Sequence, residues 1–311
     1  MAQLAKLLQK QRQARGSLAL VSTESKIKVD ESGVAFEVLP RVQGEAERLI
    51  EELMLTANEA AATLALAQQL PFVYRVHETP APEKLAALKE LLDAVGLPSG
   101  KVLPGVRPAA LSDILQRAQQ TPYAVLINSA MLRAMQKARY NEKNLGHYGL
   151  ALANYTHFTS PIRRYPDLAI HRILSAYVKG DPAEKLHKRF DSFVASASKQ
   201  SSTAELNAMG VERACEDCYK AEYMSRHIGE RYNGTVTSAA AHGIYVQLEN
   251  TIEGLVRTES LGEGMLYDGR MQYATSDGKR RVRVGDRIAV IVAAADVSTG
   301  RIDFALSDLI K

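Results

Sequence analysis

The sequence predicts an α+β protein, in which a helix-rich mixed region is followed by a small all-β barrel. Apolar residues recur with helical spacing through most of residues 1–226, whereas short alternating runs separated by turn residues follow residue 229. The chain of 311 residues is also long enough for two domains. We therefore expect one domain over residues 1–226 and a second over residues 229–307.

The N-terminal part of the chain predicts two helices separated by strands. The first helix covers residues 2–15 and ends at Gly16. The stretches SLALVST (17–23) and KIKVDESGVAFEV (26–38) predict strands, with a turn at residues 30–33. A longer helix is expected over residues 45–70. Its predicted apolar stripe consists of Leu49, Leu53, Met54, Ala57, Ala60 and Leu64.

Residues 72–226 predict a short strand followed mainly by helices. The strand is expected at residues 72–77, and the next helix lies between Pro82 and Gly96, with leucines at helical spacing. Further helices are expected over residues 111–119 and 123–138, and helical segments follow Gly180 as far as residue 226.

The segment GHYGLALANYTHFTSPIRRYPDLAIHR (146–172) is rich in aromatic, arginine and histidine residues. Alternating apolar residues in HYGLALANY predict a strand, and Pro166 predicts the start of a helix with Asp167 in its first turn. Arg163 and Arg164 would then lie at a strand-to-helix junction, where backbone N–H groups and two guanidinium groups favour a phosphate. On local sequence alone, a surface turn with solvated arginines is the alternative.

The string HFTSPIRRYPDL resembles the signature of the ribonuclease II / ribonuclease R family of processive 3′-to-5′ exoribonucleases. This resemblance implies the later half of the catalytic domain, acting on single-stranded RNA and releasing nucleoside monophosphates. It implies that Arg163 is the catalytic arginine beside the scissile phosphate, that Arg164 supports this contact and that Tyr165 is a third RNA contact. Glu212, in GVERAC, corresponds to a glutamate that contacts the terminal ribose.

Short runs between residues 232 and 306 predict the strands of the barrel. The stretch GTVTSAAAHGIYVQLENTIEGLVRTESL resembles an S1-type RNA-binding domain with the OB fold. This resemblance implies that His242, Tyr245 and Arg257 lie on the RNA-binding face. The most basic patch of the barrel is the predicted hairpin with Lys279, Arg280 and Arg281, which we expect to bind RNA, with simple solvation as the alternative.

The family resemblance also implies Mg²⁺, held by a carboxylate cluster of the DxxxDxDDA kind. Residues 1–311 contain no two adjacent aspartates, so we expect the Mg²⁺ ligands outside this chain. The chain would then be part of an exoribonuclease, with its missing N-terminal half as partner. Alternatives are a non-catalytic RNA-binding protein and a subunit completed by a separate chain that carries the carboxylates. Leu20 aligns with the aromatic residue that stacks on the terminal base in family members.

Other features favour ordinary structural roles. We expect Cys215 and Cys218 to pack on one helix face rather than to bind zinc or act in redox chemistry. We expect His147, His157 and His171 to form structural hydrogen bonds, with a position lining the RNA channel as the alternative. The two cysteines, with no export signal, predict a cytoplasmic protein, and no apolar run is long enough to span a membrane. The net charge of +4 is modest, but residues 139–189 carry nine Lys and Arg against four acids, which favours a polyanionic partner.

Overall fold

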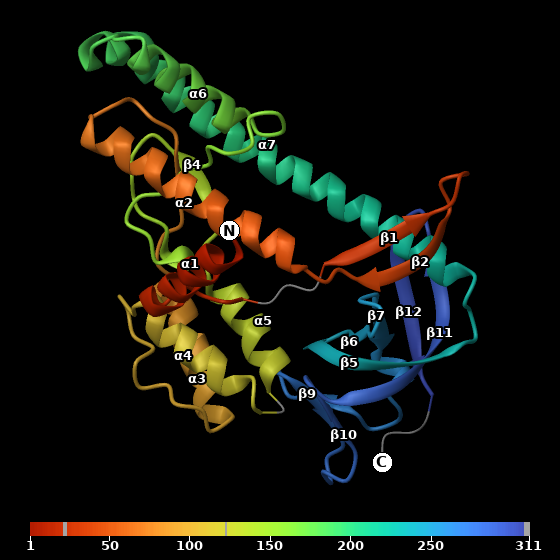
Figure 1. Cartoon of the computed structure of the whole chain (residues 1–311). Helices are drawn as coiled ribbons and strands as arrows, with labels where there is room; N and C mark the ends of the chain where they lie inside the picture. The colour runs from red at the N-terminus through yellow and green to blue at the C-terminus, as the bar shows by residue number, and fades with distance from the viewer. Residues whose placement is uncertain (21–23, 122, 308–311) are drawn as a thin grey trace. The chain divides into compact units, whose positions relative to one another are not determined.

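The computed structural model describes residues 1–20, 24–121 and 123–307 (Figure 1). The chain forms two compact units. The first unit comprises Met1–Ala19, Gln43–Ile114 and Met131–Ala208, and the second comprises Leu20–Val42, Leu115–Ala130 and the chain from Met209 onward. The boundary expected near residues 227–228 concerns sequence domains, and it stays a prediction.

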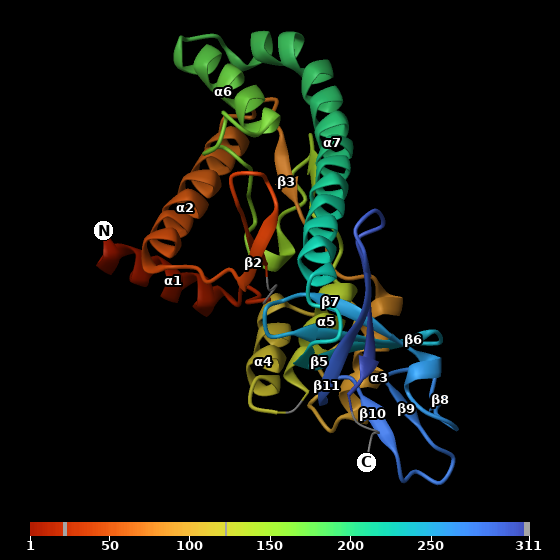
Figure 2. The same ribbon diagram turned by 90° about the vertical axis from the view of Figure 1, so that its right-hand side faces the viewer.

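The first unit is built from helices packed on a small antiparallel sheet of β3 (Tyr74–Val76) and β4 (Arg139–Asn141). Buried side chains of α2, α6 and the N-terminal part of α7 meet this sheet in one core. In Figure 2 the ribbon of β3 lies between those of α2 and α7. The helices that lie wholly or partly in this unit are α1 (Ala2–Arg15), α2 (Glu45–Ala67), α3 (Pro82–Ala94), α4 (Pro108–Ala118), α5 (Ala124–Ala134), α6 (Tyr165–Val178) and α7 (Ala183–Ser225).

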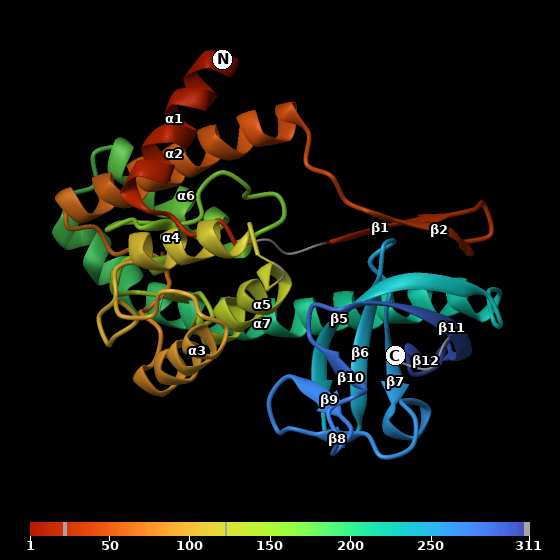
Figure 3. The ribbon, with the colours of Figure 1, turned by 90° about the horizontal axis from the view of Figure 1, so that it is seen from below.

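The second unit contains a closed five-stranded barrel in the order β11-β12-β7-β6-β5, in which only the β12–β7 pairing is parallel (Figure 3). Phe304 fills its interior against Gly254, where an added Cβ would lie 2.5 Å from the ring, so the barrel requires a glycine there. The strands of the barrel are β5 (Arg231–Ala240), β6 (Gly243–Leu248), β7 (Glu253–Arg257), β11 (Arg287–Asp296) and β12 (Arg301–Leu306).

Two further sheets belong to the second unit. The hairpin of β1 (Ser25–Val29) and β2 (Ala35–Pro40) is joined to α7, because the Ala35 backbone N–H donates to Glu222 Oε2 at 3.0 Å. A small antiparallel sheet of β8 (Leu266–Tyr267), β9 (Gln272–Ala274) and β10 (Arg281–Arg283) is inserted between β7 and β11. The α+β class, with a helical region and a C-terminal barrel, is therefore confirmed.

The apolar stripe predicted for α2 is wrong. Its buried residues are Glu52, Asn58 and three alanines, whereas Leu64 is 42% exposed. The polar residues are buried because each has a partner: Arg12 Nη2 donates to Glu52 Oε1 at 2.6 Å, and Asn58 Nδ2 donates to the Tyr155 hydroxyl at 3.1 Å. Hydrophobic periodicity cannot detect a face that is buried through paired polar groups.

The strand predicted in HYGLALANY is also wrong. Residues Tyr148–Leu150 form a 3-10 turn, capped by His147, whose Nδ1 accepts the Leu150 backbone N–H at 3.3 Å. Tyr148 and Leu152 are buried, but they reach the interior from either side of this turn rather than from one strand. The arginine-bearing turn is therefore not a strand-to-helix junction, although α6 does begin at Tyr165, with Pro166 in its first turn.

Smaller differences concern a predicted strand and the predicted helical segments after Gly180. Residues 17–20 form no strand, and residues 21–23 of the same predicted strand lie outside the described residues. The helical segments expected after Gly180 are one continuous helix, α7. Within the described part of the chain, no helix combines the length and apolar character needed to cross a membrane.

Candidate functional site

The turn that precedes α6 is closed by its own backbone. The carbonyl of Ser160 accepts the backbone N–H groups of Arg163, at 3.3 Å, and Arg164, at 3.1 Å. Proline residues bound this turn, because Pro161 follows Ser160 directly and Pro166 occupies the first turn of the helix. A proline there fixes φ without sacrificing a helical hydrogen bond. The sequence therefore favours one sharply defined conformation for the segment that carries both arginines.

Asp167 locks this turn from inside the protein. Its side chain is fully buried, and its two oxygens accept three N–H groups. Arg164 supplies two of them, from Nε at 2.9 Å and Nη2 at 2.8 Å, and the Ser160 backbone N–H supplies the third at 2.8 Å. The prediction of an acid in the first turn of the helix is confirmed, and this acid also anchors Arg164 in a two-pronged ion pair.

The two arginines therefore differ in what they can do. Arg164 is half-buried and paired with Asp167, whereas Arg163 is exposed and makes no side-chain hydrogen bond or ion pair with any residue that the structure describes. Next to Arg163, Ile162 is fully exposed and Tyr165 is 52% exposed. Arg163 is thus the cation that is available to an anionic ligand, and Arg164 holds the turn that presents it.

Packing from α2 and α6 fixes the segment that leads into the turn. The Phe158 ring stacks on His171 with centroids 4.5 Å apart and planes inclined by 5°. His171 Nε2 lies 2.9 Å from the Phe158 carbonyl, and Asn58 Oδ1 accepts the Phe158 backbone N–H at 2.9 Å. His171 therefore has the structural hydrogen-bonding role that we expected for it.

A row of aromatic rings lies behind this segment. His77, His147, Tyr155, His157 and Tyr140 follow one another edge to face, with centroid separations between 5.1 and 5.8 Å. Burial lowers the pKa of His147 to about 3 and that of His157 to about 2, and nearby cations add to both effects. These imidazoles are therefore neutral at physiological pH, so they add no positive charge to the site.

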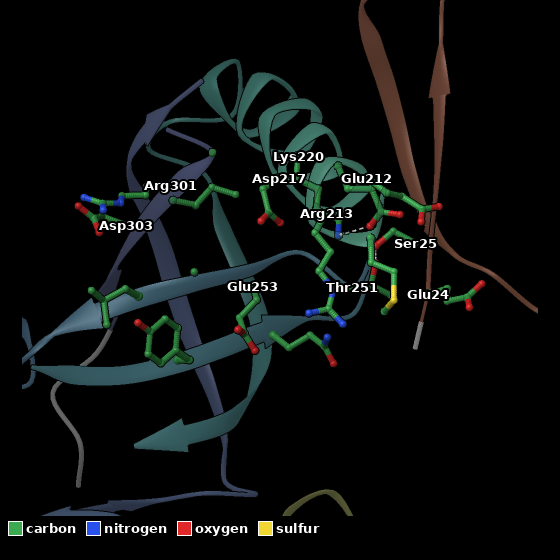
Figure 4. A pocket seen from close by; sticks show the side chains of 18 of the residues that line it. Glu24, Ser25, Glu212, Arg213, Asp217, Lys220, Thr251, Glu253, Arg301 and Asp303 are labelled. Carbon is green, nitrogen blue, oxygen red and sulfur yellow. Dashed lines mark hydrogen bonds and ion pairs between the residues drawn. The ribbon is translucent and has the colours of Figure 1, made fainter. Parts of the chain in front are cut away.

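The second unit contains a cavity of about 1030 Å³ between α7, the start of β1 and the barrel (Figure 4). Glu212 and Arg213 line it from α7, and Arg301 and Asp303 line it from the barrel. Glu212 is exposed and forms no hydrogen bond or ion pair with any described residue. Six carboxylates and five Lys and Arg side chains line the cavity, so its charges nearly balance and it does not attract phosphates by charge alone.

Three predicted RNA-binding residues of the barrel meet at this cavity. His242 and Tyr245 are in contact, with Nε2 of His242 3.0 Å from the Tyr245 hydroxyl and ring centroids 5.7 Å apart. Arg257 lies on the adjacent strand and donates to Asp303 Oδ2 from Nη2 at 2.9 Å and Nε at 3.3 Å. His242 is exposed and Tyr245 is half-buried, whereas Asp303 neutralises the charge of Arg257.

The basic hairpin is separate from this group of residues. Lys279 and Arg281 are exposed, whereas Arg280 is half-buried and its guanidinium donates to the Glu263 carbonyl. Lys279 lies 3.8 Å from Asp277, a distance typical of a weak, solvated pair. Of the three side chains, Arg281 is therefore the one with the most freedom to bind phosphate.

The remaining candidates contribute little to a site. Cys215 and Cys218 are free thiols three residues apart on α7, but Cys215 is exposed, so the expected packing does not hold for it. Leu20 is half-buried, and its suggested correspondence to a base-stacking residue stays a prediction. Among the described residues, no group of three or more His, Cys, Asp or Glu side chains could hold a metal ion. The described residues therefore do not fit a Mg²⁺ site.

Sequence reasoning missed three side-chain pairs: Arg257 with Asp303, His157 with Tyr140, and Arg164 with Asp167. Asp303 lies 46 positions from Arg257 along the chain, and Tyr140 lies 17 positions from His157. Neither spacing corresponds to a helical or strand period, so the sequence carried no local signal for these pairs. The third partner, Asp167, was visible three residues after Arg164, a spacing at which side chains on a helix meet.

Comparison with known families matches both parts of the chain. Residues 1–180 match the RNB domain, and residues 226–307 match the S1 RNA binding domain.

Curated relatives extend this similarity over nearly the whole chain. Ribonuclease R 1 of Lactococcus lactis is 38% identical over 306 residues, which cover 98% of this chain and 38% of that protein. Ribonuclease R of Thermotoga maritima is 38% identical over 310 residues, covering 98% of this chain and 43% of that protein. The chain thus spans about two fifths of the length of these relatives.

Solved structures show the same architecture. The apo form of Mycoplasma genitalium RNase R superimposes with a TM-score of 0.88 at 26% identity, over 98% of this chain and 48% of that chain. The same enzyme in complex with ribose-methylated single-stranded RNA gives a TM-score of 0.88 at 27% identity, with the same coverage.

Proposed function

The chain belongs to the RNB family, and from this premise we propose that it is part of a hydrolytic 3′-to-5′ exoribonuclease that degrades single-stranded RNA to nucleoside monophosphates. The observation that carries this proposal is Arg163, which has no side-chain partner among the described residues and lies in a turn that Asp167 holds in place. A similar enzyme has been solved with single-stranded RNA, which supports RNA as the ligand.

In this proposal, Arg163 binds the scissile phosphate and neutralises the charge that develops on it in the transition state. Arg164 acts mainly through position, because its guanidinium is committed to Asp167. A guanidinium offers five N–H donors and this pair uses two, so Arg164 retains capacity for a secondary phosphate contact. Tyr165, half exposed at the same turn, is a third RNA contact.

The second unit would hold RNA mainly by stacking and hydrogen bonding. His242 and Tyr245 present aromatic faces, and each stacked base contributes about 1–3 kcal/mol. Glu212 can accept a hydrogen bond from a ribose 2′-hydroxyl, which would favour RNA over DNA. The phosphates of the RNA backbone would be contacted by Arg257, Lys279, Arg280 and Arg281. The contacts of Arg257 and Arg280 would be weaker, because both side chains also hydrogen bond to protein groups.

The Mg²⁺ that the family resemblance implies would require carboxylates from outside the described residues, because these residues contain no group that fits a metal ion. Such an ion would supply an activated water and charge stabilisation, whereas this chain would bind and orient the RNA. We also propose that the protein is cytoplasmic, since both of its cysteines are free thiols.

A non-catalytic RNA-binding protein is the second candidate function. The lack of a metal-binding group among the described residues favours it, since the predicted RNA contacts need no metal. A subunit completed by a separate chain with the carboxylates would combine both functions.

Degradation and binding of one RNA test whether this chain binds RNA and whether it cleaves RNA by itself. A 5′-labelled single-stranded RNA is incubated with the chain and Mg²⁺, and its binding is measured separately with EDTA present. Binding without cleavage would support an RNA-handling part that requires carboxylates from elsewhere. A Mg²⁺-dependent ladder that shortens from the 3′ end would show a metal site within this chain, and loss of RNA binding altogether would contradict the proposed function.

A further inference from the structure

His157 lies on the segment before α6, and its ring is held in one orientation. Its Nδ1 lies 2.9 Å from the Tyr140 hydroxyl oxygen. The ring packs edge to face against Tyr140, at 5.6 Å, and against Tyr155, at 5.8 Å. The neighbouring residues are also held: Thr156 Oγ1 donates to the Val73 carbonyl at 2.6 Å, and the Phe158 backbone N–H donates to Asn58 Oδ1 at 2.9 Å. Rotation of this imidazole would therefore break both its hydrogen bond and its ring contacts.

The Tyr140 hydroxyl selects one tautomer of this imidazole. Tyr140 is 5% exposed, and among the described residues its hydroxyl has only His157 as a hydrogen-bond partner. If the hydroxyl donates to Nδ1, its proton is satisfied and the ring proton resides on Nε2. In the other tautomer Nδ1 would donate, and the hydroxyl proton would be buried without an acceptor, which is unfavourable. The environment therefore favours a neutral ring with Nε2–H.

This Nε2–H group is available to a ligand. It hydrogen bonds to no described residue, and His157 is only half-buried. The ring lies close enough to Arg163 and Arg164 to feel their charges, which, after burial, help to lower the pKa of His157. His157 lies three residues before Ser160, whose carbonyl closes the turn, so a neutral donor lies on the segment that leads to Arg163. A phosphodiester oxygen is the acceptor that both groups can share.

We infer that His157 is a further RNA-contacting residue, which donates its Nε2–H to a non-bridging phosphate oxygen of the strand bound by Arg163. This inference rests on the proposed function, because it requires RNA at the turn. Tyr140 is the corresponding positioning residue, since it acts only by fixing the tautomer. His157 would supply a directional hydrogen bond to the phosphate oxygen, whereas Arg163 supplies positive charge.

The test combines variants with the salt dependence of RNA binding by the full chain. Binding of a fluorescent single-stranded RNA is measured for wild type, His157→Asn, His157→Gln, Tyr140→Phe and Arg163→Ala at several salt concentrations. Glutamine can present an amide N–H near the position of Nε2, whereas asparagine is too short to do so. Nitrogen-15 NMR of the imidazoles reports the tautomer directly, and thermal unfolding monitors folding.

We expect His157→Asn to weaken binding about tenfold, as for a lost hydrogen bond to a charged group, with the salt slope unchanged. His157→Gln should recover most of this loss, and Tyr140→Phe should lower affinity less than His157→Asn while allowing both tautomers. By contrast, Arg163→Ala should reduce the slope by about 0.7, the value for one phosphate contact on a single strand.

Equal RNA affinity for His157→Asn and wild type would overturn the inference while leaving the proposed function intact. An Nδ1–H tautomer in the wild-type spectrum would overturn it as well. So would equal affinity losses in both His157 variants that accompany equal losses of stability, because these indicate a purely structural residue. If the wild-type chain binds no RNA, the proposed function fails and the inference fails with it.

Discussion

Asp167 and Arg164 form a bidentate ion pair across the first turn of α6, and the carboxylate end of this pair is fully buried. The same carboxylate holds the Ser160 backbone N–H, so one side chain closes both ends of the turn that carries Arg163. A buried carboxylate is costly unless its oxygens are satisfied, and here three N–H donors satisfy them. The turn is therefore coupled to the stability of the unit around it.

Replacing Asp167 with asparagine should destabilise the protein strongly. The change leaves the half-buried Arg164 without its counter-charge, and breaking such a pair costs about 3–5 kcal/mol. Denaturant unfolding of the variant checks this. Glu184→Gln is the matched control, because it removes a carboxylate from an exposed pair with Lys188 and should cost less than about 1 kcal/mol. Equal midpoints for the two variants would contradict the locking role of Asp167.

Substitutions of Arg163 and Arg164 should have different effects on stability and RNA binding. Arg163→Ala should leave the unfolding midpoint unchanged, since this side chain has no partner among the described residues, but it should lower RNA affinity and its salt dependence. Arg164→Ala should instead lower stability, because it leaves the buried carboxylate of Asp167 without its counter-charge. Parallel unfolding and binding measurements on both variants test this, with Lys179→Ala as an exposed cation on the same unit for control. Identical behaviour of the two arginine variants would refute the division of roles.

Much of the fold was predictable because its local signals are strong. Gly16 ends α1 in the left-handed conformation, and Pro82 begins α3, as glycine and proline do at helix ends. The barrel strands follow from alternating residues between clear turns. The central motif also placed Arg163 and Arg164 correctly before a helix.

What the sequence could not supply was the pairing of distant side chains. The apparent strand around Tyr148 is a 3-10 turn, which a distant contact also holds, because the Tyr148 hydroxyl donates to the Val106 carbonyl at 2.8 Å. The buried face of α2 depends on Arg12 and Tyr155, neither of which is near it in sequence. The neutralisation of Arg257 by Asp303 likewise follows from the β12–β7 pairing, in which Asp303 lies opposite Leu255.

Removing the partner of Arg257 should strengthen RNA binding. Asp303→Asn frees the guanidinium and removes one negative charge from the cavity wall, so affinity for single-stranded RNA should rise several-fold and the salt slope should steepen by about 0.7. Fluorescence anisotropy at two salt concentrations measures both effects. Glu184→Gln changes net charge equally in the other unit and should alter neither. Unchanged or weaker binding by Asp303→Asn would show that Arg257 does not contact RNA.

The buried histidines should make the protein sensitive to acid. Burial lowers the pKa of His147 to about 3 and that of His157 to about 2, whereas both titrate near 6.5 in the unfolded chain. Below pH 6.5 the unfolded state therefore binds more protons, so stability is fully present above this pH and falls as the pH decreases towards the folded values. Well below pH 6.5, each imidazole should lower the free energy of unfolding by up to about 1.4 kcal/mol for each pH unit of acidification.

Urea unfolding between pH 7.5 and 5 measures this slope. In His157→Asn, the free energy of unfolding should depend less steeply on pH, by roughly the contribution of one imidazole. His187→Asn is the control of opposite sign, because hydrogen bonds to Asp191 and the Gln69 carbonyl raise the pKa of His187. The stability that this exposed histidine contributes is present below 6.5 and is lost as the pH rises, so its removal should not flatten the acid side of the curve. If His157→Asn kept the wild-type slope, the imidazole would not be the buried neutral group that its contacts with Tyr140 and Tyr155 indicate.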